Sequence, residues 1–150
     1  MQLQLATKPA TSQDLEFVWE VYKEAVRSKV EPHLANGWVD ADEFVRFRDN
    51  WKVGNSHIIT LDGAPIGWGG AVISTDKVLL EHLYIAPAYR GKKYGRRLVS
   101  ELLQQWAREG KTVHAPILRG SAAGSAALDL GFQKDADGHG PLVEMFTHRH

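Results

Sequence analysis

The stretch Arg90-Gly-Lys-Lys-Tyr-Gly-Arg-Arg97 decides how this chain is interpreted. It follows a run typical of a strand, residues 78–85, and precedes a run typical of a helix, residues 98–109. Five of its eight residues are Arg or Lys, and two are glycines, which let backbone N–H groups approach a bulky ligand. A helix N-terminus adds unpaired N–H donors and the positive end of the helix dipole. The stretch therefore predicts a phosphate-binding turn.

The composition is that of an ordinary globular protein. The chain has 150 residues, of which 43% are hydrophobic and 24% are charged. This length suits one core, so we expect a single domain over residues 1–150. Because 18 basic and 18 acidic side chains cancel, the basic stretch is a local feature, and no nucleic-acid partner is expected. A solvated helix start is the alternative for the stretch, and we disfavour it because like charges without an anion repel each other.

Several classes of site are excluded by residue content. The chain has no cysteine, which excludes disulfides, thiolate metal sites and cysteine nucleophiles. Its seven histidines have no paired ligand spacing, so we expect no metal site. The N-terminal residues lack the pattern of a signal peptide, and no apolar run approaches the ~20 residues of a membrane span. We therefore expect a cytoplasmic protein without a membrane partner.

Hydrophobic periodicity and turn signals predict the element order βααβββαβαββ. Short turns make the middle three strands antiparallel, and a crossover through the helix after the basic stretch makes the next strand parallel. We expect an α/β fold with a mixed, mostly antiparallel sheet of six to seven strands and helices on both faces. The expected strands are residues 2–8, 56–61, 65–74, 78–85, 112–118, 132–134 and 142–147; the expected helices are residues 15–30, a helix capped by Asp40, and residues 98–109 and 121–130. Hairpin turns are expected at Asp62-Gly63 and across residues 137–140.

Two common nucleotide-binding motifs do not match. A Walker A loop needs four residues between its glycines, whereas three residues separate Gly91 from Gly95, and Arg96 follows. The GxGxxG fingerprint of dinucleotide-binding folds is absent, and the glycines at residues 67–70 precede a strand and not a helix.

The motif order resembles that of the GNAT superfamily of coenzyme A-dependent N-acetyltransferases. That family has a strand ending in Leu-x-Val-x-Pro, then Arg/Gln-x-x-Gly-x-Gly, then a helix. This chain has Leu83-Tyr-Ile-Ala-Pro87 followed by Arg90-Gly-Lys-Lys-Tyr-Gly95, with a late Gly131-Phe132. The resemblance covers nearly the whole chain and implies a GNAT fold. It also implies transfer of an acetyl group from acetyl-CoA to a primary amine of a small molecule or peptide by direct attack.

The resemblance also implies where coenzyme A binds. The pyrophosphate is expected on the backbone of residues 92–96, and the pantetheine is expected to extend along residues 83–85 as an added strand-like segment. The expected coenzyme-binding residues are Leu83, Tyr84, Ile85, Arg90, Gly91, Lys92, Lys93, Tyr94, Gly95, Arg96 and Arg97.

Two positions depart from the family pattern. Lys93 stands where the family has its first motif glycine, and Ala127 stands where many relatives have a Tyr that protonates the leaving thiolate. A thiolate is a fair leaving group, so a missing acid need not abolish turnover. Possible substitutes for the acid, each with packing, capping or surface exposure as its alternative role, are Tyr84, Tyr94, Ser121 and Ser125. Of these, Tyr84 is kept as a catalytic candidate.

Glu81 is the candidate for the general base. Strand alternation puts it on one face with Leu79 and Leu83, although many relatives carry the base one pleat earlier, at the position of Leu79. A structural role as partner of a basic residue is equally open. His82 points to the other face, where packing is expected.

Other functions remain open. The loss of the usual Tyr and the Lys93 substitution allow a catalytically degenerate protein that binds or senses acyl-CoA without turnover. An anion-binding interaction module is a third hypothesis. The acceptor amine is not identified by the sequence, and a homodimer is the default expectation for oligomeric state.

Overall fold

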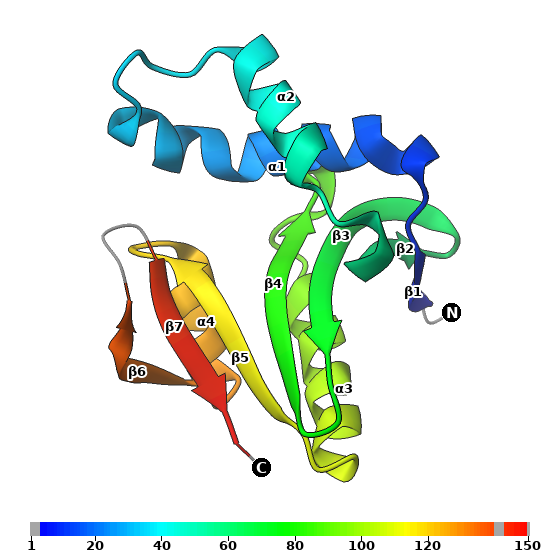
Figure 1. Cartoon of the computed structure of the whole chain (residues 1–150). Helices are drawn as coiled ribbons and strands as arrows, with labels where there is room; N and C mark the ends of the chain where they lie inside the picture. The colour runs from blue at the N-terminus through cyan, green and yellow to red at the C-terminus, as the bar shows by residue number, and fades with distance from the viewer. Residues whose placement is uncertain (1–3, 140–142, 150) are drawn as a thin grey trace. The chain divides into compact units, whose positions relative to one another are not determined.

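The computed structural model describes residues 4–139 and 143–149. Within them, seven strands follow the hydrogen-bonded order β1-β2-β3-β4-β5-β7-β6 (Figure 1). The strands are β1 (Leu5–Pro9), β2 (Ser56–Leu61), β3 (Ala64–Ile73), β4 (Lys77–Ile85), β5 (Thr112–Leu118), β6 (Gln133–His139) and β7 (Val143–His148). The α-helices are α1 (Leu15–Val30), α2 (Asp40–Asn50), α3 (Tyr94–Arg108) and α4 (Ala122–Asp129).

The sheet is mixed, as the sequence predicts. β4 and β5 pair in parallel, whereas β1–β2, β2–β3, β5–β7 and β6–β7 are antiparallel pairs. The chain divides into two compact units, one formed by Met1–Gly70 and His82–Tyr94, the other by Ala71–Glu81 and Gly95–His150. Strands β3 and β4 each contribute residues to both units, and the single domain expected from the chain length stays a prediction.

The first unit is built on the apolar face of α1. A capping box precedes this helix: Thr11 Oγ1 accepts a hydrogen bond from Gln13 N, and Asp14 Oδ2 accepts one from Thr11 N at 2.9 Å. Val18 and Val21 of α1 are fully buried with Ile58 of β2 and Trp68 of β3. The predicted helix over residues 15–30 is therefore confirmed, with a core that joins it to two strands.

The predicted cap of α2 is wrong. The capping position belongs to Val39, and Asp40 is the first helical residue. The Asp40 carboxylate instead accepts a hydrogen bond from Trp38 Nε1 at 2.6 Å, and Lys23 Nζ lies 3.6 Å from it. The Trp38 hydrogen bond, with a smaller contribution from the cations Lys23 and Arg27, holds the pKa of Asp40 below its usual range. The Asp40 side chain, which was expected to accept a hydrogen bond from the helix backbone, therefore accepts one from a tryptophan.

Helix α3, which belongs to the second unit from Gly95 on, begins four residues before the predicted start at residue 98. Lys93, with a φ of 64°, ends the preceding loop, and Tyr94 already belongs to the helix. The buried side chains of α3 are Leu98, Val99, Leu103 and Trp106, and Gly110 follows its end with a φ of 75°. The basic residues Arg96 and Arg97 are therefore in the first helical turn and not in a loop.

The final hairpin differs from its prediction. Residues 137–139 were expected to form a turn but lie within β6, and Gly140 lies outside the described residues. The β6–β7 pairing is irregular, because its register shifts between Lys134 and His139. A shift of this kind absorbs extra residues into a strand, which explains why a turn-like sequence is not a turn here.

No helix in the described part of the chain combines the length and the apolar character that a membrane span requires.

Candidate active site

The basic stretch has an unusual backbone. A 3-10 turn at Pro87–Tyr89 follows β4, with Tyr89 N donating to Ala86 O at 2.9 Å and Arg90 N donating to Pro87 O at 3.2 Å. Gly91, with a φ of 80°, and Lys93, with a φ of 64°, then adopt the left-handed conformation. Left-handed residues among right-handed ones turn successive N–H groups toward one concave side, which suits an anion. Lys93 thus adopts a backbone conformation that usually belongs to glycine.

The start of α3 adds further donors. The first four N–H groups of an α-helix have no acceptor within that helix. In α3 these belong to Tyr94, Gly95, Arg96 and Arg97. The positive end of the helix dipole lies at the same place. Backbone donors beside several cations form the donor set that a diphosphate accepts, so the residues present fit the pyrophosphate of coenzyme A.

The arginines of the stretch have partners that the sequence did not reveal. Arg90 Nε donates to Ile85 O at 2.7 Å, which ties the loop to the end of β4. Arg96 lies 3.0 Å from Asp129 of α4, and Arg97 lies 3.7 Å from Glu101 of α3. Arg96 and Arg97 therefore have acidic partners, contrary to the expectation that the cations of this stretch are unopposed. Both pairs are half-exposed and contribute about 0–1 kcal/mol, so a phosphate can compete for either arginine.

Strands β4 and β5 pair over only a short distance. Their parallel register in the second unit joins Lys77 to Thr112, Val78 to Val113 and Leu79 to His114. Beyond His114, β5 continues to Leu118 while it pairs with β7. The described β4–β5 register thus ends before β5 does. Amide groups along such a strand edge can pair with the amides of an extended ligand, as a pantetheine chain requires.

The two catalytic candidates of the sequence lie on one strand but not on one face. Glu81 is half-buried on β4, and alternation along the strand gives it the same face as Leu79. Tyr84 has the opposite parity and shares its face with His82, whose Nδ1 lies 3.3 Å from the Tyr84 hydroxyl. A base and an acid that act on one acceptor amine and one thiol would therefore act from different sides of β4.

Tyr84 belongs to a cluster of aromatic rings in the first unit. Its ring centroid lies 5.5 Å from that of Trp68 and 5.8 Å from that of Tyr22. Burial raises the pKa of Tyr84, and the neighbouring Tyr22 adds to the rise. The phenol therefore keeps its proton at neutral pH and can act as a hydrogen-bond donor. His82, which was expected to pack, has its ring 5.2 Å from Trp68.

The extent of this aromatic cluster was not predicted. The rings of α1 and α2 recur at helical steps in the sequence, which indicates a core or a groove lining, but this periodicity does not join them to β3 and β4. The alternation Gly67-Trp68-Gly69 was a signal, because glycines on one face of a strand let a neighbouring backbone approach closely. The members of the cluster are Trp19, Tyr22, Trp38, Phe44, Phe47, Trp51, Trp68, His82 and Tyr84.

The other hydroxyl side chains considered as the acid lie at the start of α3 and in or beside α4. Tyr94 is the first residue of α3, and Ser125 is exposed on α4. Ser121 precedes α4 without capping it through its side chain, and its buried Oγ has no hydrogen-bond partner in the described part of the chain. Ala127, at the position of the family's Tyr, is buried.

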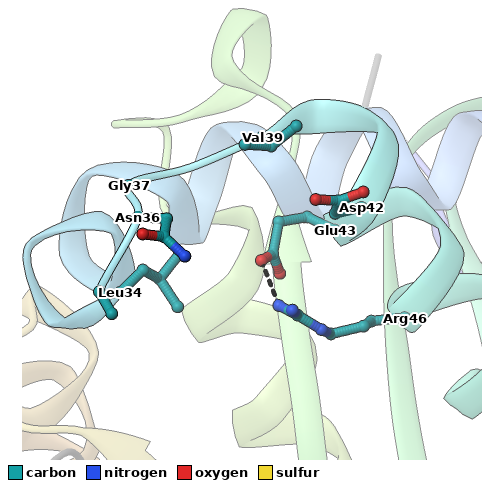
Figure 2. A pocket seen from close by; sticks show the side chains of 8 residues that line it. Leu34, Asn36, Gly37, Val39, Asp42, Glu43 and Arg46 are labelled. Atoms are coloured by element: carbon teal, nitrogen blue, oxygen red, sulfur yellow. Dashed lines mark hydrogen bonds and ion pairs between the residues drawn. The ribbon is translucent and has the colours of Figure 1, made fainter.

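A cavity of about 190 Å³ lies between the loop after α1 and the first turns of α2 (Figure 2). Its polar side chains are Asn36, Asp42, Glu43 and Arg46, and Glu43 forms an ion pair with Arg46. Only 15% of the Glu43 side chain is exposed, and its charge adds to burial in raising the pKa of Tyr22. The cavity is mildly acidic, because two carboxylates and one guanidinium are among its lining side chains.

The raised tyrosine pKa values predict loss of stability in alkali. In the folded chain Tyr22 and Tyr84 hold their protons above the ordinary tyrosine pKa of about 10, whereas the unfolded chain releases them there. Stability contributed by these groups is fully present below pH 10 and falls as the pH rises further. We expect Tyr84→Phe to flatten the decline of the free energy of unfolding above pH 10, measured by urea titration at several pH values. Tyr89→Phe serves as a control, and an equally flattened decline in that variant would contradict the assignment.

Comparison with known proteins gives these features a family. A family model described as acetyltransferase (GNAT) family matches residues 17–130. The chain belongs to the GNAT acetyltransferase family. Acetyl-CoA is the acetyl donor in this family, and the resemblance drawn from the basic stretch is confirmed. The comparison with curated proteins returned no match.

Solved structures share the GNAT fold. The PaiA N-acetyltransferase of Thermoplasma acidophilum, in complex with coenzyme A, aligns with a TM-score of 0.68 and 19% identity over 100% of both chains. The ribosomal-protein-S18-alanine N-acetyltransferase of Escherichia coli aligns with a TM-score of 0.65 and 16% identity over 97% of this chain and 94% of that one. The yncA protein of Salmonella typhimurium, with its cofactor acetyl-CoA, aligns with a TM-score of 0.58 and 22% identity over 95% and 91%.

Proposed function

We propose that this GNAT protein transfers an acetyl group from acetyl-CoA to a primary amine by direct attack. The observation that carries the proposal is the backbone between β4 and α3, where left-handed Gly91 and Lys93 lead into the unpaired N–H groups of a helix start. We propose that coenzyme A binds to the residues expected from the sequence, which are residues 83–85 and 90–97.

The reaction requires the protein to assist two proton transfers and to stabilise an oxyanion. An ammonium must lose a proton, because an alkylamine has a pKa of about 10.4 and is mostly protonated at neutral pH. The nitrogen then bonds to the thioester carbon while the carbon–sulfur bond breaks, and the sulfur leaves as a thiolate that takes up a proton. The developing oxyanion needs an N–H donor, which we assign to the backbone of residues 83–85.

The proton steps are assigned to the candidates on β4. The candidates from the sequence are Glu81 for the base and Tyr84 for the source of the thiol proton. The high pKa of Tyr84 makes it a weak acid, so donation of a hydrogen bond to the sulfur is its more effective contribution. Water supplies the proton where Tyr84 does not.

The acceptor is proposed as a class and not as a compound. Two of the similar structures are named as a PaiA N-acetyltransferase and as a ribosomal-protein-S18-alanine N-acetyltransferase. For this chain we propose a primary amine on a small molecule or a peptide. The acidic cavity beside α2 is where a cationic group of such a molecule would find Asp42 and Glu43. We further propose a cytoplasmic location and a homodimer.

The proposal predicts amine-dependent thiol release. The purified full chain is incubated with acetyl-CoA and a panel of primary amines that covers polyamines, amino acids, aminoglycosides and short peptides, and free thiol is measured. At least one amine is expected to raise the rate about 100-fold or more above the rate without amine, and mass spectrometry of that amine should show one added acetyl group. Binding of acetyl-CoA with no acetylated product would support the acyl-CoA sensor in place of the enzyme.

A further inference from the structure

Three polar side chains from three strands form a hydrogen-bonded chain in the second unit. Thr147 Oγ1 on β7 donates to Asp135 Oδ2 on β6 at 2.8 Å. The same hydroxyl lies 3.2 Å from His114 Nδ1 on β5. Thr147 is only 4% exposed, so water does not compete freely for its hydroxyl. The arrangement links a carboxylate to one nitrogen of an imidazole through a buried hydroxyl.

The hydroxyl fixes which nitrogen of His114 carries the proton. A threonine hydroxyl has one hydrogen, and here it is given to the Asp135 carboxylate. The bond to His114 must then run the other way, with Nδ1–H as the donor and Thr147 Oγ1 as the acceptor. A neutral imidazole protonated on Nδ1 has its lone pair on Nε2. The chain of bonds therefore prepares Nε2 as a proton acceptor.

His114 stands at the point where the paired part of β4 and β5 ends. It is opposite Leu79 in the last described pair of that register. Paired residues of neighbouring strands share a face, and Glu81 lies two residues beyond Leu79 on that face. The titratable and charged groups of this face are thus Lys77 and Glu81 from β4 and Asp135 from β6. The described pairing of β5 with β4 ends at His114.

We propose that His114 is the general base of the acetyl transfer, with Thr147 and Asp135 as positioning residues; this rests on the proposed function. Nε2 takes a proton from the acceptor nitrogen as that nitrogen bonds to the thioester carbon, and the displaced sulfur leaves with the bonding electrons. The resulting imidazolium keeps its Nδ1–H on Thr147, and Asp135 stabilises the positive charge through that hydroxyl. His114 thereby takes the role of base for which Glu81 was the candidate, and the Glu81 carboxylate on the same face attracts the cationic acceptor.

The tautomer is tested without any acceptor. Long-range proton–nitrogen spectra of the ¹⁵N-labelled full chain report the protonation state of each ring nitrogen, and His114→Gln identifies the signals of His114. We expect an unprotonated Nε2 and a protonated Nδ1 in the wild type, with loss of this preference in Thr147→Val and its rescue in Thr147→Ser. A proton on Nε2 in the wild type would overturn the proposal.

The catalytic role is tested with the amine found to be acetylated. His114→Gln is expected to lower kcat about 100-fold or more while the KM for acetyl-CoA changes less than about twofold, and Glu81→Gln is expected mainly to raise the KM for the amine. His57→Gln, an exposed histidine on β2, is the matched control and should leave both constants unchanged. Undiminished kcat in His114→Gln would sink this inference alone, whereas absence of acetyl-CoA binding in the wild type would sink the proposed function.

Discussion

The double variant Arg90→Glu, Arg96→Glu is expected to lose the rise in melting temperature that acetyl-CoA gives the wild-type chain. Both arginines flank the backbone donors at the start of α3, where we place the pyrophosphate. A hydrogen bond from a charged donor contributes about 1.5–3 kcal/mol, so removing two weakens binding by about 100-fold or more. At a ligand concentration of about 100 Kd the wild type gains about 2.7 kcal/mol, which raises the melting temperature by about 5–10 °C.

Charge reversal also disturbs contacts within the protein, so each variant needs its own reference without ligand. Arg90 Nε holds Ile85 O, and Arg96 pairs with Asp129, so each variant is compared with its own melting temperature without ligand. A matched control, Lys29→Glu with Arg108→Glu, makes the same change in net charge at exposed residues of α1 and at the far end of α3. It should keep the full ligand-induced shift. An equal loss in the control would mean that net charge, and not this turn, governs binding.

The second large effect concerns Gly67 on β3. A Cβ added at Gly67 would lie 2.2 Å from the Tyr84 carbonyl oxygen and 3.1 Å from Ile85 Cα, so backbone atoms of β4 would have to move. Overpacking of this kind costs about 1–3 kcal/mol and more where the obstacle is backbone. We expect Gly67→Ala to lower the melting temperature by about 4–12 °C in differential scanning calorimetry.

Gly54→Ala is the control for that variant, because nothing lies within 4 Å of its added Cβ. It should melt close to the wild type. The displaced residues 84–85 are also those along which we place the pantetheine, so Gly67→Ala should bind acetyl-CoA more weakly as well. A Gly67→Ala protein that melts together with Gly54→Ala and binds acetyl-CoA normally would show that β4 tolerates the shift.

The sequence predicts elements whose signals are local. Asp62 and Gly63 were expected to form a hairpin turn, and both adopt positive φ angles, 51° and 87°, that suit it. The start of α3 was placed too late because a lysine in the left-handed conformation is not a sequence signal. Residues 137–139 do not form the expected turn, because the irregular pairing of β6 with β7 depends on a partner strand.

Contacts between distant residues were beyond prediction for a different reason. Asp129 of α4 forms an ion pair with Arg96 of α3, and Thr147 lies 33 residues from His114 in the chain. Only the strand order β5-β7-β6 brings His114, Thr147 and Asp135 together. A single sequence identified the motif that we propose to bind the acetyl donor, whereas the arrangement that prepares a proton acceptor depends on which strands become neighbours.

The aromatic cluster has a consequence for spectroscopy. Four of the five tryptophans, Trp19, Trp38, Trp51 and Trp68, lie in the first unit, and only Trp106 lies in the second. Intrinsic fluorescence of this protein therefore reports mainly on α1, α2 and the strands beside them, with energy passing readily between rings so close together. A Trp106→Phe chain would confine the emission to that unit, so its quenching during an amine titration would follow events there without interference from α3.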